Sequence, residues 1–163
     1  MEVLVQFHLR SGAADLRVLS QLARGAIRET LAAQEAPADC EISVLYVHDE
    51  EMRRLNTEFR GMDEATDVLA FAMRESGNPP MPGAPGSSEM LGDVVVSLDA
   101  AVRQAARRGH SARREVATLL IHGALHLAGC DHAEAGAAGR ARARTMRAAE
   151  KRCIQTLEKK MIV

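Results

Sequence analysis

The stretch HGALHLAGCDH, residues 122–132, combines three histidines and a glycine in a spacing that suits a metal-binding helix. His122 and His126 lie four residues apart, so on a helix they share one face and are about 6 Å apart along the axis. Gly129 can adopt the left-handed conformation that ends a helix, which would turn the chain and return His132 toward the same ion. Three neutral imidazoles leave one tetrahedral position open, as catalytic zinc sites do. The stretch therefore predicts one Zn²⁺ per chain, held by His122, His126 and His132.

Neighbouring side chains leave the complete ligand set open. Cys130 and Asp131 are candidate fourth ligands, because thiolates and carboxylates also bind zinc. A lone pair of histidines at this spacing is more often an ordinary feature of a helix, but the glycine and the third histidine favour a metal site. Zinc peptidases share this spacing and carry glutamate, their general base, directly after the first histidine. Here that position is Gly123, so a peptidase is only a minor hypothesis.

Hydrophobic periodicity around this stretch predicts a single α+β domain over residues 1–163. With 163 residues and 47% hydrophobic content, the chain can bury one substantial core but not two. Short apolar runs predict strands at 2–7, 40–47, 66–73 and 90–98. Caps and apolar stripes predict helices at 16–34, 49–60, 99–108, 111–127 and 137–160. Because strands and helices do not strictly alternate, we expect a small mixed sheet of about four strands packed with about five helices, one of them a zincin-like metal helix.

Residues 74–89 interrupt this pattern. They hold four of the five prolines and three glycines. Such a composition disfavours regular structure, so it predicts a long Pro/Gly-rich loop.

The global composition points to neither a membrane protein nor a strongly basic nucleic-acid binder. The net charge of −1 and the pI near 6.6 mean that any RNA contact must come from a local patch. The four aromatic residues lie in apolar segments, so we expect core roles instead of a base-stacking platform. No run approaches the roughly 20 apolar residues of a membrane span, and the first residues lack the pattern of a signal peptide. Three widely spaced cysteines favour reduced thiols, and we expect a cytoplasmic protein.

Two clusters of basic side chains flank the metal-binding stretch. They allow two interpretations, a track for an RNA backbone or ordinary solvated helix faces. The first cluster precedes the stretch and consists of Arg103, Arg107, Arg108, His110, Arg113 and Arg114. The second follows it and consists of Arg140, Arg142, Arg144 and Arg147.

Several separated blocks of the sequence resemble one family. HGALHLAGCDH resembles the HGxLHLxGxDH signature of the YbeY family of bacterial endoribonucleases, proteins that act in ribosomal RNA maturation. Upstream, LNTEFRGMDEATDVLAFA (55–72) resembles the block LNxxYRxxDxxTDVLSFP, and LGDVVVSL (91–98) resembles the strand LGDIVIS. GHSARREVATLLIHG (109–123) and the later Met146/Glu150 pair also fit the family. The resemblance covers residues from about 40 to 157.

The sequence also departs from the family pattern. Ala70 and Ala72 replace the usual serine and proline, and Phe59 replaces tyrosine. Cys130 stands where the family commonly has tyrosine. None of these departures removes a metal ligand.

The resemblance implies that His122, His126 and His132 are zinc ligands and that His122 takes part in catalysis. A zinc ion held by histidines can lower the pKa of its water to about 7, which provides hydroxide without a glutamate base. It can also polarise a phosphoryl oxygen. Both roles suit cleavage of a phosphodiester.

The resemblance further implies a catalytic role for Arg60. Its guanidinium could bind a phosphate in two places and offset the charge that develops on the oxygens, whereas the alternative is a solvated arginine at a helix end. Asp67 and Asp131 are candidates for orienting a ligand imidazole, or simply for capping turns.

Taken with the family, the histidines predict a single-strand-specific, metal-dependent endoribonuclease in 16S rRNA 3′-end maturation and ribosome quality control. The alternative is a zinc-stabilised ribosome-assembly factor that acts mainly by binding rRNA and assembly proteins. By the resemblance, the partners are ribosomal RNA, a small-subunit ribosomal protein and an Era-type GTPase.

Overall fold

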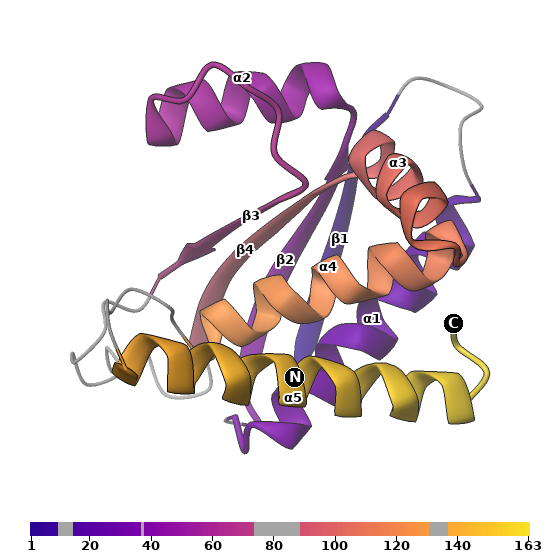
Figure 1. Cartoon of the computed structure of the whole chain (residues 1–163), viewed down its shortest axis with the longest axis vertical. Coiled ribbons are helices and arrows are strands. Elements are labelled where there is room, and N and C mark those ends of the chain that lie inside the picture. Colours follow the sequence, from indigo (N-terminus) through magenta and orange to yellow (C-terminus); the bar gives the residue numbers. More distant parts are fainter. Residues whose placement is uncertain (10–14, 37, 74–88, 131–136) are drawn as a thin grey trace.

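The structure, a computed structural model, describes residues 1–9, 15–36, 38–73, 89–130 and 137–163. These ranges contain four strands and five helices, and Figure 1 shows their arrangement. The strands are β1 (Glu2–His8), β2 (Cys40–Val47), β3 (Val68–Ala72) and β4 (Glu89–Ser97). The helices are α1 (Leu16–Ala33), α2 (Asp49–Arg60), α3 (Leu98–Arg108), α4 (Ala112–Leu127) and α5 (Ala137–Lys159). The α+β class and the number of elements predicted from the sequence are confirmed.

The strands form one mixed sheet in the order β1-β2-β4-β3. β1, β2 and β4 are parallel, and the edge strand β3 runs antiparallel to β4. Val94 of β4 lies between Val44 of β2 and Ala70 of β3, at the centre of the sheet. The sheet therefore has the mixed character that the sequence predicted.

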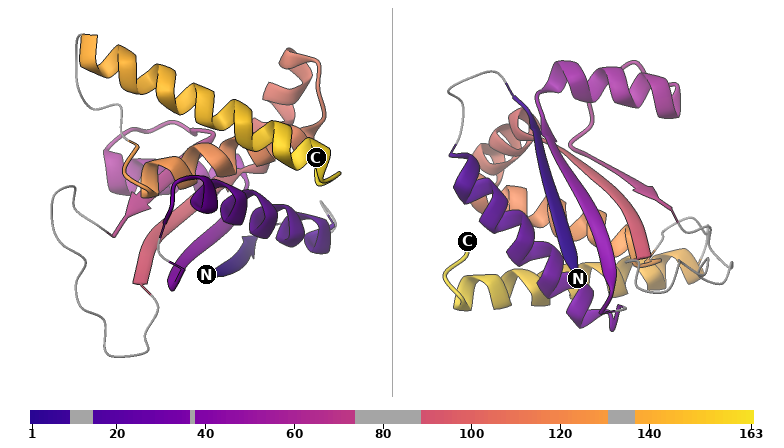
Figure 2. Two further views of the ribbon diagram at one scale, coloured as in Figure 1. Left: turned by 90° about the horizontal axis from the view of Figure 1, so that it is seen from below. Right: turned by 180° about the vertical axis from the view of Figure 1, so that it is seen from behind.

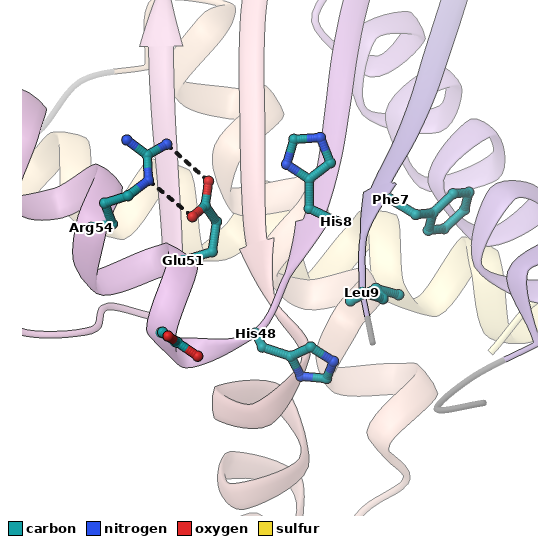
Figure 3. A pocket seen from close by; sticks show the side chains of 7 residues that line it. Phe7, His8, Leu9, His48, Glu51 and Arg54 are labelled. Atoms are coloured by element: carbon teal, nitrogen blue, oxygen red, sulfur yellow. Dashed lines mark hydrogen bonds and ion pairs between the residues drawn. The ribbon is translucent and has the colours of Figure 1, made fainter. Parts of the chain in front are cut away.

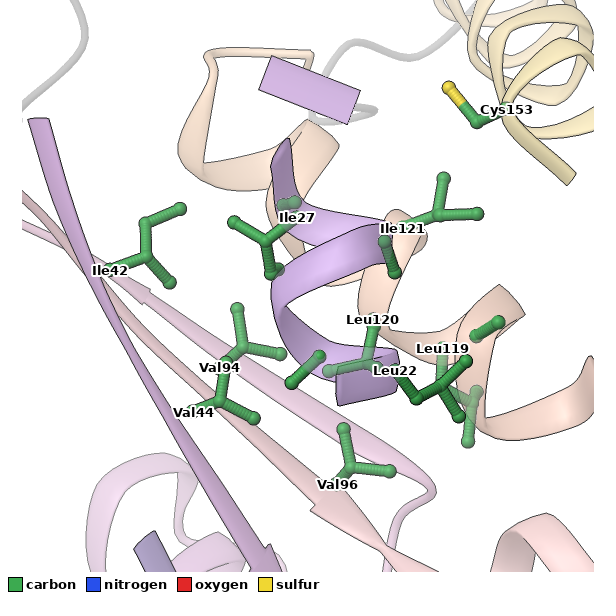
Figure 4. Close-up of a cluster of buried hydrophobic side chains, with 14 of the residues drawn as sticks. Leu22, Ile27, Ile42, Val44, Val94, Val96, Leu119, Leu120, Ile121 and Cys153 are labelled. Carbon is green, nitrogen blue, oxygen red and sulfur yellow. The ribbon is translucent and has the colours of Figure 1, made fainter. Parts of the chain in front are cut away.

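The two faces of the sheet are covered by different helices, because side chains alternate along each strand. On one face, Val44 and Val94 join the large core formed with α1, α4 and α5 (Figures 2 and 4). On the other face, Leu69 and Val95 pack against Met52 of α2. The candidate metal helix, α4, thus lies on the opposite side of the sheet from α2.

Capping residues mark where the helices begin and end. The side chain of Asp15 accepts hydrogen bonds from two backbone N–H groups of α1, and Ser111 does the same for the N–H of Arg114 in α4. α2 ends at Gly61, which has φ 69° and takes the left-handed conformation. These boundaries agree with the predicted ones to within about two residues.

The end of α4 has the predicted glycine turn. Gly129 has φ 85°, and its N–H donates to the carbonyl of His126 at 2.9 Å. The N–H of Cys130 donates to the carbonyl of Leu125, also at 2.9 Å. These two bonds and the left-handed glycine form a Schellman motif. The chain therefore turns away from the helix axis directly after the second histidine.

Replacing Gly129 with alanine is expected to destabilise the fold by about 1–2 kcal/mol, the cost of a Cβ in the left-handed region. Gly129→Asn should cost less, because asparagine tolerates this conformation better. The free energy of unfolding in urea measures both effects. A Gly129→Ala variant as stable as wild type would contradict the assigned backbone conformation.

One prediction about the core is wrong. Phe59 was expected inside, but its side chain is 58% exposed, with its ring edge-on to Phe71 at a centroid distance of 5.0 Å. It lies in the last turn of α2, beyond the edge of the apolar contact with the sheet. The predicted loop at 74–89 lies outside the described residues, apart from Glu89, which begins β4.

None of the helices in the described ranges is both long and apolar enough to cross a membrane.

Candidate metal centre

The first two predicted ligands meet on α4. The Nε2 atoms of His122 and His126 are 3.2 Å apart, and the two rings meet at 75° with centroids 4.7 Å apart. Two nitrogens that bind one tetrahedral zinc ion at about 2.0–2.1 Å lie about 3.3 Å from each other. The two histidines therefore fit a shared zinc ion, as the sequence predicted for this pair.

A carboxylate fixes the ring of His122. Oε1 of Glu150, on α5, lies 2.6 Å from Nδ1 of His122, and both side chains are largely sheltered from solvent. A carboxylate can only accept, so Nδ1 carries the proton and the lone pair of Nε2 points toward His126. This is the tautomer that zinc ligation requires, and a carboxylate behind a ligand imidazole is the usual support for such a site.

The role of Glu150 was not predicted from its sequence neighbours. It is 28 positions from His122, and only the packing of α5 against α4 brings the two together. The available signal was the Met146/Glu150 pair: Met146 is buried in the core and anchors α5, one turn before the carboxylate. For Asp67, the alternative role of capping a turn is seen, because its Oδ1 accepts from the N–H of Val68 and its Oδ2 from Nε2 of Gln104 at 2.6 Å, and its orienting role stays a prediction.

A Glu150→Ala variant is expected to bind zinc about 10–100-fold more weakly than wild type, as when the outer partner of a ligand histidine is removed. Glu150→Gln should lose less, because its amide oxygen can still accept from Nδ1. Competition with a chromophoric chelator measures the affinity. Glu158→Ala is a matched control, since this carboxylate lies on the same helix but pairs with Arg114. Equal zinc affinity in wild type and Glu150→Ala would exclude the assigned role.

Packing explains the glycine between the histidines. Gly123 lies in the face of α4 that rests on the sheet, where an added Cβ would be 2.6 Å from Cγ1 of Val94. A side chain at this position would point into the sheet and not toward the histidines. A glutamate base therefore has no room here, which argues against the peptidase hypothesis.

The remaining predicted ligands cannot be placed in the same way. His132 and Asp131 lie outside the described residues. Within the described ranges, no group of three or more His, Cys, Asp or Glu side chains could hold a metal ion. The ligand role of His132 stays a prediction.

Cys130 is oriented toward α1. Its Sγ donates to Oε1 of Gln34, the C-cap of that helix, at 3.5 Å. Burial raises the pKa of the Cys130 thiol above its ordinary value. The thiol therefore has a hydrogen-bond partner on α1, and the role of Cys130 as a fourth ligand stays a prediction.

Arg60 lies away from the histidine pair. It is the last residue of α2, on the opposite face of the sheet from α4, and its side chain is exposed. No hydrogen bond or ion pair joins it to the part of the chain that the structure describes. The structure does not bring Arg60 together with His122, and its catalytic role stays a prediction.

A cleft borders His122 on its Glu150 side. It has a volume of about 410 Å³ and lies between the start of β3 and helices α3, α4 and α5. We call it the His122 cleft, because His122 and Glu150 form part of its wall. Arg108 and Arg147 also line it. The candidate metal centre is therefore next to a cavity large enough for a small ligand.

A second pocket lies where β1 and β2 end. It has a volume of about 590 Å³ and includes His8, His48, Glu51 and Arg54 (Figure 3). The guanidinium of Arg54 binds both oxygens of Glu51 and holds the pKa of that carboxyl below its ordinary value. None of the predicted site residues lines this pocket. The histidine pair on α4 remains the stronger candidate for chemistry.

Comparison with known proteins agrees with the sequence blocks. The sequence model of the family described as Endoribonuclease YbeY matches residues 6–158. The protein named Endoribonuclease YbeY in Desulforamulus reducens is 45% identical over 114 residues, which cover 70% of this chain and 73% of that protein. The protein of the same name in Pelotomaculum thermopropionicum is 45% identical over 133 residues, 81% of this chain and 84% of that protein.

A solved structure shows the same fold. The solution structure of TM1509 from Thermotoga maritima aligns with a TM-score of 0.64 and 22% identity, over 98% of this chain and 91% of that one. At this identity the likeness concerns the fold alone. The family match spans nearly the whole chain and includes both histidines of the metal helix, and the chain therefore belongs to the YbeY endoribonuclease family.

Proposed function

We propose that this chain is a zinc-dependent endoribonuclease that cleaves single-stranded RNA in 16S rRNA 3′-end maturation and ribosome quality control. The observation that carries the proposal is the convergence of two Nε2 atoms on α4, 3.2 Å apart, with Glu150 behind one of them. Family membership supplies the substrate class, since the relatives are named endoribonucleases. In this proposal residues 1–163 form one catalytic domain that acts in the cytoplasm.

His122, His126 and His132 would hold the zinc ion, and the thiol of Cys130 would keep its contact with Gln34. A bound zinc ion would supply Lewis-acid chemistry to the phosphodiester and lower the pKa of a water molecule. Glu150 keeps the proton on Nδ1 of His122 and fixes the plane of its ring. Because Gly123 leaves no room for a side chain, the residue after the first histidine takes no part in proton transfer.

By the family resemblance, Arg60 would bind a phosphate of the RNA substrate, although it lies apart from the histidine pair in this structure. Its guanidinium is exposed, and none of the carboxylates in the described ranges forms an ion pair with it that would compete with a phosphate. A guanidinium can donate two parallel hydrogen bonds to phosphate oxygens. Such donors stabilise charge that develops during cleavage.

Matched RNA fragments test the proposal. A single-stranded fragment from the 3′ region of 16S rRNA should be cut by the zinc-loaded protein, and the same fragment in a duplex should not. Chelation should stop cleavage, and added zinc should restore it. Arg60→Ala and His126→Ala, purified in parallel, control for contamination: activity equal to wild type in both would show that another nuclease makes the cuts.

A zinc-stabilised assembly factor is the second candidate. The net charge of −1 gives no general attraction for RNA, which favours a role in which assembly proteins help to hold the chain on rRNA. In this role the chain would bind rRNA together with a small-subunit ribosomal protein and an Era-type GTPase. Rescue of an assembly defect by a folded, zinc-binding but cleavage-dead variant would favour this second function, and failure of the rescue would exclude it.

A further inference from the structure

The two basic clusters that flank the metal helix differ in their ion pairs. In the first cluster, Arg108 pairs with the buried Glu115 at 2.6 Å, and Arg114 pairs with Glu158 at 2.8 Å. Arg103 is bound to Asp49. Carboxylates thus neutralise much of the cluster that precedes the metal helix, which fits the interpretation as a solvated face.

Three arginines of the second cluster and one further lysine form a basic stripe along α5. Four exposed basic side chains recur at helical spacing, and we call them the α5 stripe: Arg140, Arg144, Arg147 and Lys151. Their positions fall within one narrow face of the helix and span about 16 Å along its axis. None of them forms an ion pair with a residue in the described ranges. The stripe therefore carries net positive charge that the described chain does not neutralise.

The stripe passes beside the candidate metal centre. Arg147 lines the His122 cleft together with Glu150, and Arg108 stands on α3 across the same cleft. The two carboxylates in this wall are already engaged: Glu150 with His122 at 2.6 Å and Asp67 with Gln104 at 2.6 Å. An anion at Arg147 would thus lie in the same cleft as His122, and the carboxylates that line this cleft already have partners.

We propose that the α5 stripe binds the phosphate backbone of the single-stranded RNA substrate and leads it through the His122 cleft to the metal centre. This inference rests on the proposed function, because it takes RNA as the substrate. Guanidinium groups on one helix face suit a flexible polyanion, since they bind phosphates without reading bases. The stripe also explains how a chain with a net charge of −1 can hold RNA at one local surface.

The test removes three charges from the stripe. The variant Arg140→Gln/Arg144→Gln/Arg147→Gln is compared with Arg17→Gln/Arg24→Gln/Arg28→Gln, which removes the same charges from an exposed face of α1 that does not line the cleft. Arg108 is left unchanged, because its loss would leave the buried Glu115 without this partner. Fluorescence anisotropy measures binding of the zinc-loaded proteins to a single-stranded deoxyoligonucleotide, whose backbone charge matches RNA. Cleavage of the RNA of the same sequence is followed below saturation.

The α5 variant should bind about a hundredfold more weakly at about 0.1 M salt, and its slope of log affinity against log salt should fall by about 2, at about 0.7 per lost phosphate contact. Its cleavage of dilute RNA should fall in parallel, while the α1 variant should match wild type in both assays. Equal losses in the two variants, or none in either, would overturn the inference. A wild type that binds through the stripe but never cleaves RNA would instead overturn the proposed function and leave the stripe supported.

Discussion

A Gly123→Glu variant is expected to lose its native fold instead of gaining peptidase activity. The substitution would create the glutamate that zinc peptidases carry after their first histidine. In this fold, however, the added Cβ would lie 2.6 Å from Cγ1 of Val94 and 3.1 Å from its Cγ2. The rest of the side chain would place a carboxylate against the sheet, where no described cation pairs with it. Thermal unfolding followed by circular dichroism should show no cooperative transition.

Smaller changes isolate the packing effect. Gly123→Ala should destabilise by about 1–3 kcal/mol through overpacking, offset in part by the better helix propensity of alanine, about 1 kcal/mol. Val94→Ala removes the two methyl groups that a new Cβ would meet. The double variant should therefore be more stable than the sum of the single effects predicts, as contacting residues often show. A folded Gly123→Glu with the melting temperature of wild type would contradict this account of α4 on the sheet.

A His126→Ala variant is expected to lose bound zinc and RNA cleavage while keeping its fold. Alanine is the best helix former, and His126 is only partly buried, so α4 should persist. Cleavage should fall by about a thousandfold, because Lewis-acid stabilisation of a phosphoryl group is worth several kcal/mol. Elemental analysis measures the metal, and a defined rRNA fragment measures the rate. His8→Ala, an exposed histidine of β1, serves as the control.

Full cleavage activity in His126→Ala would show that His126 is not a ligand of a catalytic zinc ion. Retained zinc with lost cleavage would also conflict with the account, because it would place the ion on other ligands.

Local rules explain why most of the elements could be predicted. The strand at 40–47 and the helix at 49–60 have the predicted bounds, because strand alternation, a first turn of acids and Gly61 act within a few residues. The pairing of His122 with His126 is local in the same way, since i and i+4 always share a helix face. The left-handed turn at Gly129 is likewise local, because it depends on the conformational freedom of a single glycine.

The same local rules could not predict contacts between elements that are far apart in the sequence. Glu150 reaches His122 from another helix, and no spacing rule relates positions on two helices. The hydrogen bond from Gln104 of α3 to Asp67 joins positions 37 residues apart and was not predicted either. Ion pairs such as Arg108 with Glu115 likewise depend on the relative placement of helices. The sequence therefore predicted where the basic clusters lie. It could not predict which of their charges form ion pairs in the folded chain.

The most direct test of a catalytic zinc centre is to titrate zinc into chelated protein while measuring both bound metal and cleavage of single-stranded rRNA. The account predicts that cleavage is absent without zinc, rises in proportion to bound zinc and saturates at one ion per chain. Cleavage at full rate by zinc-free protein, or one tightly bound zinc without any cleavage, would contradict it.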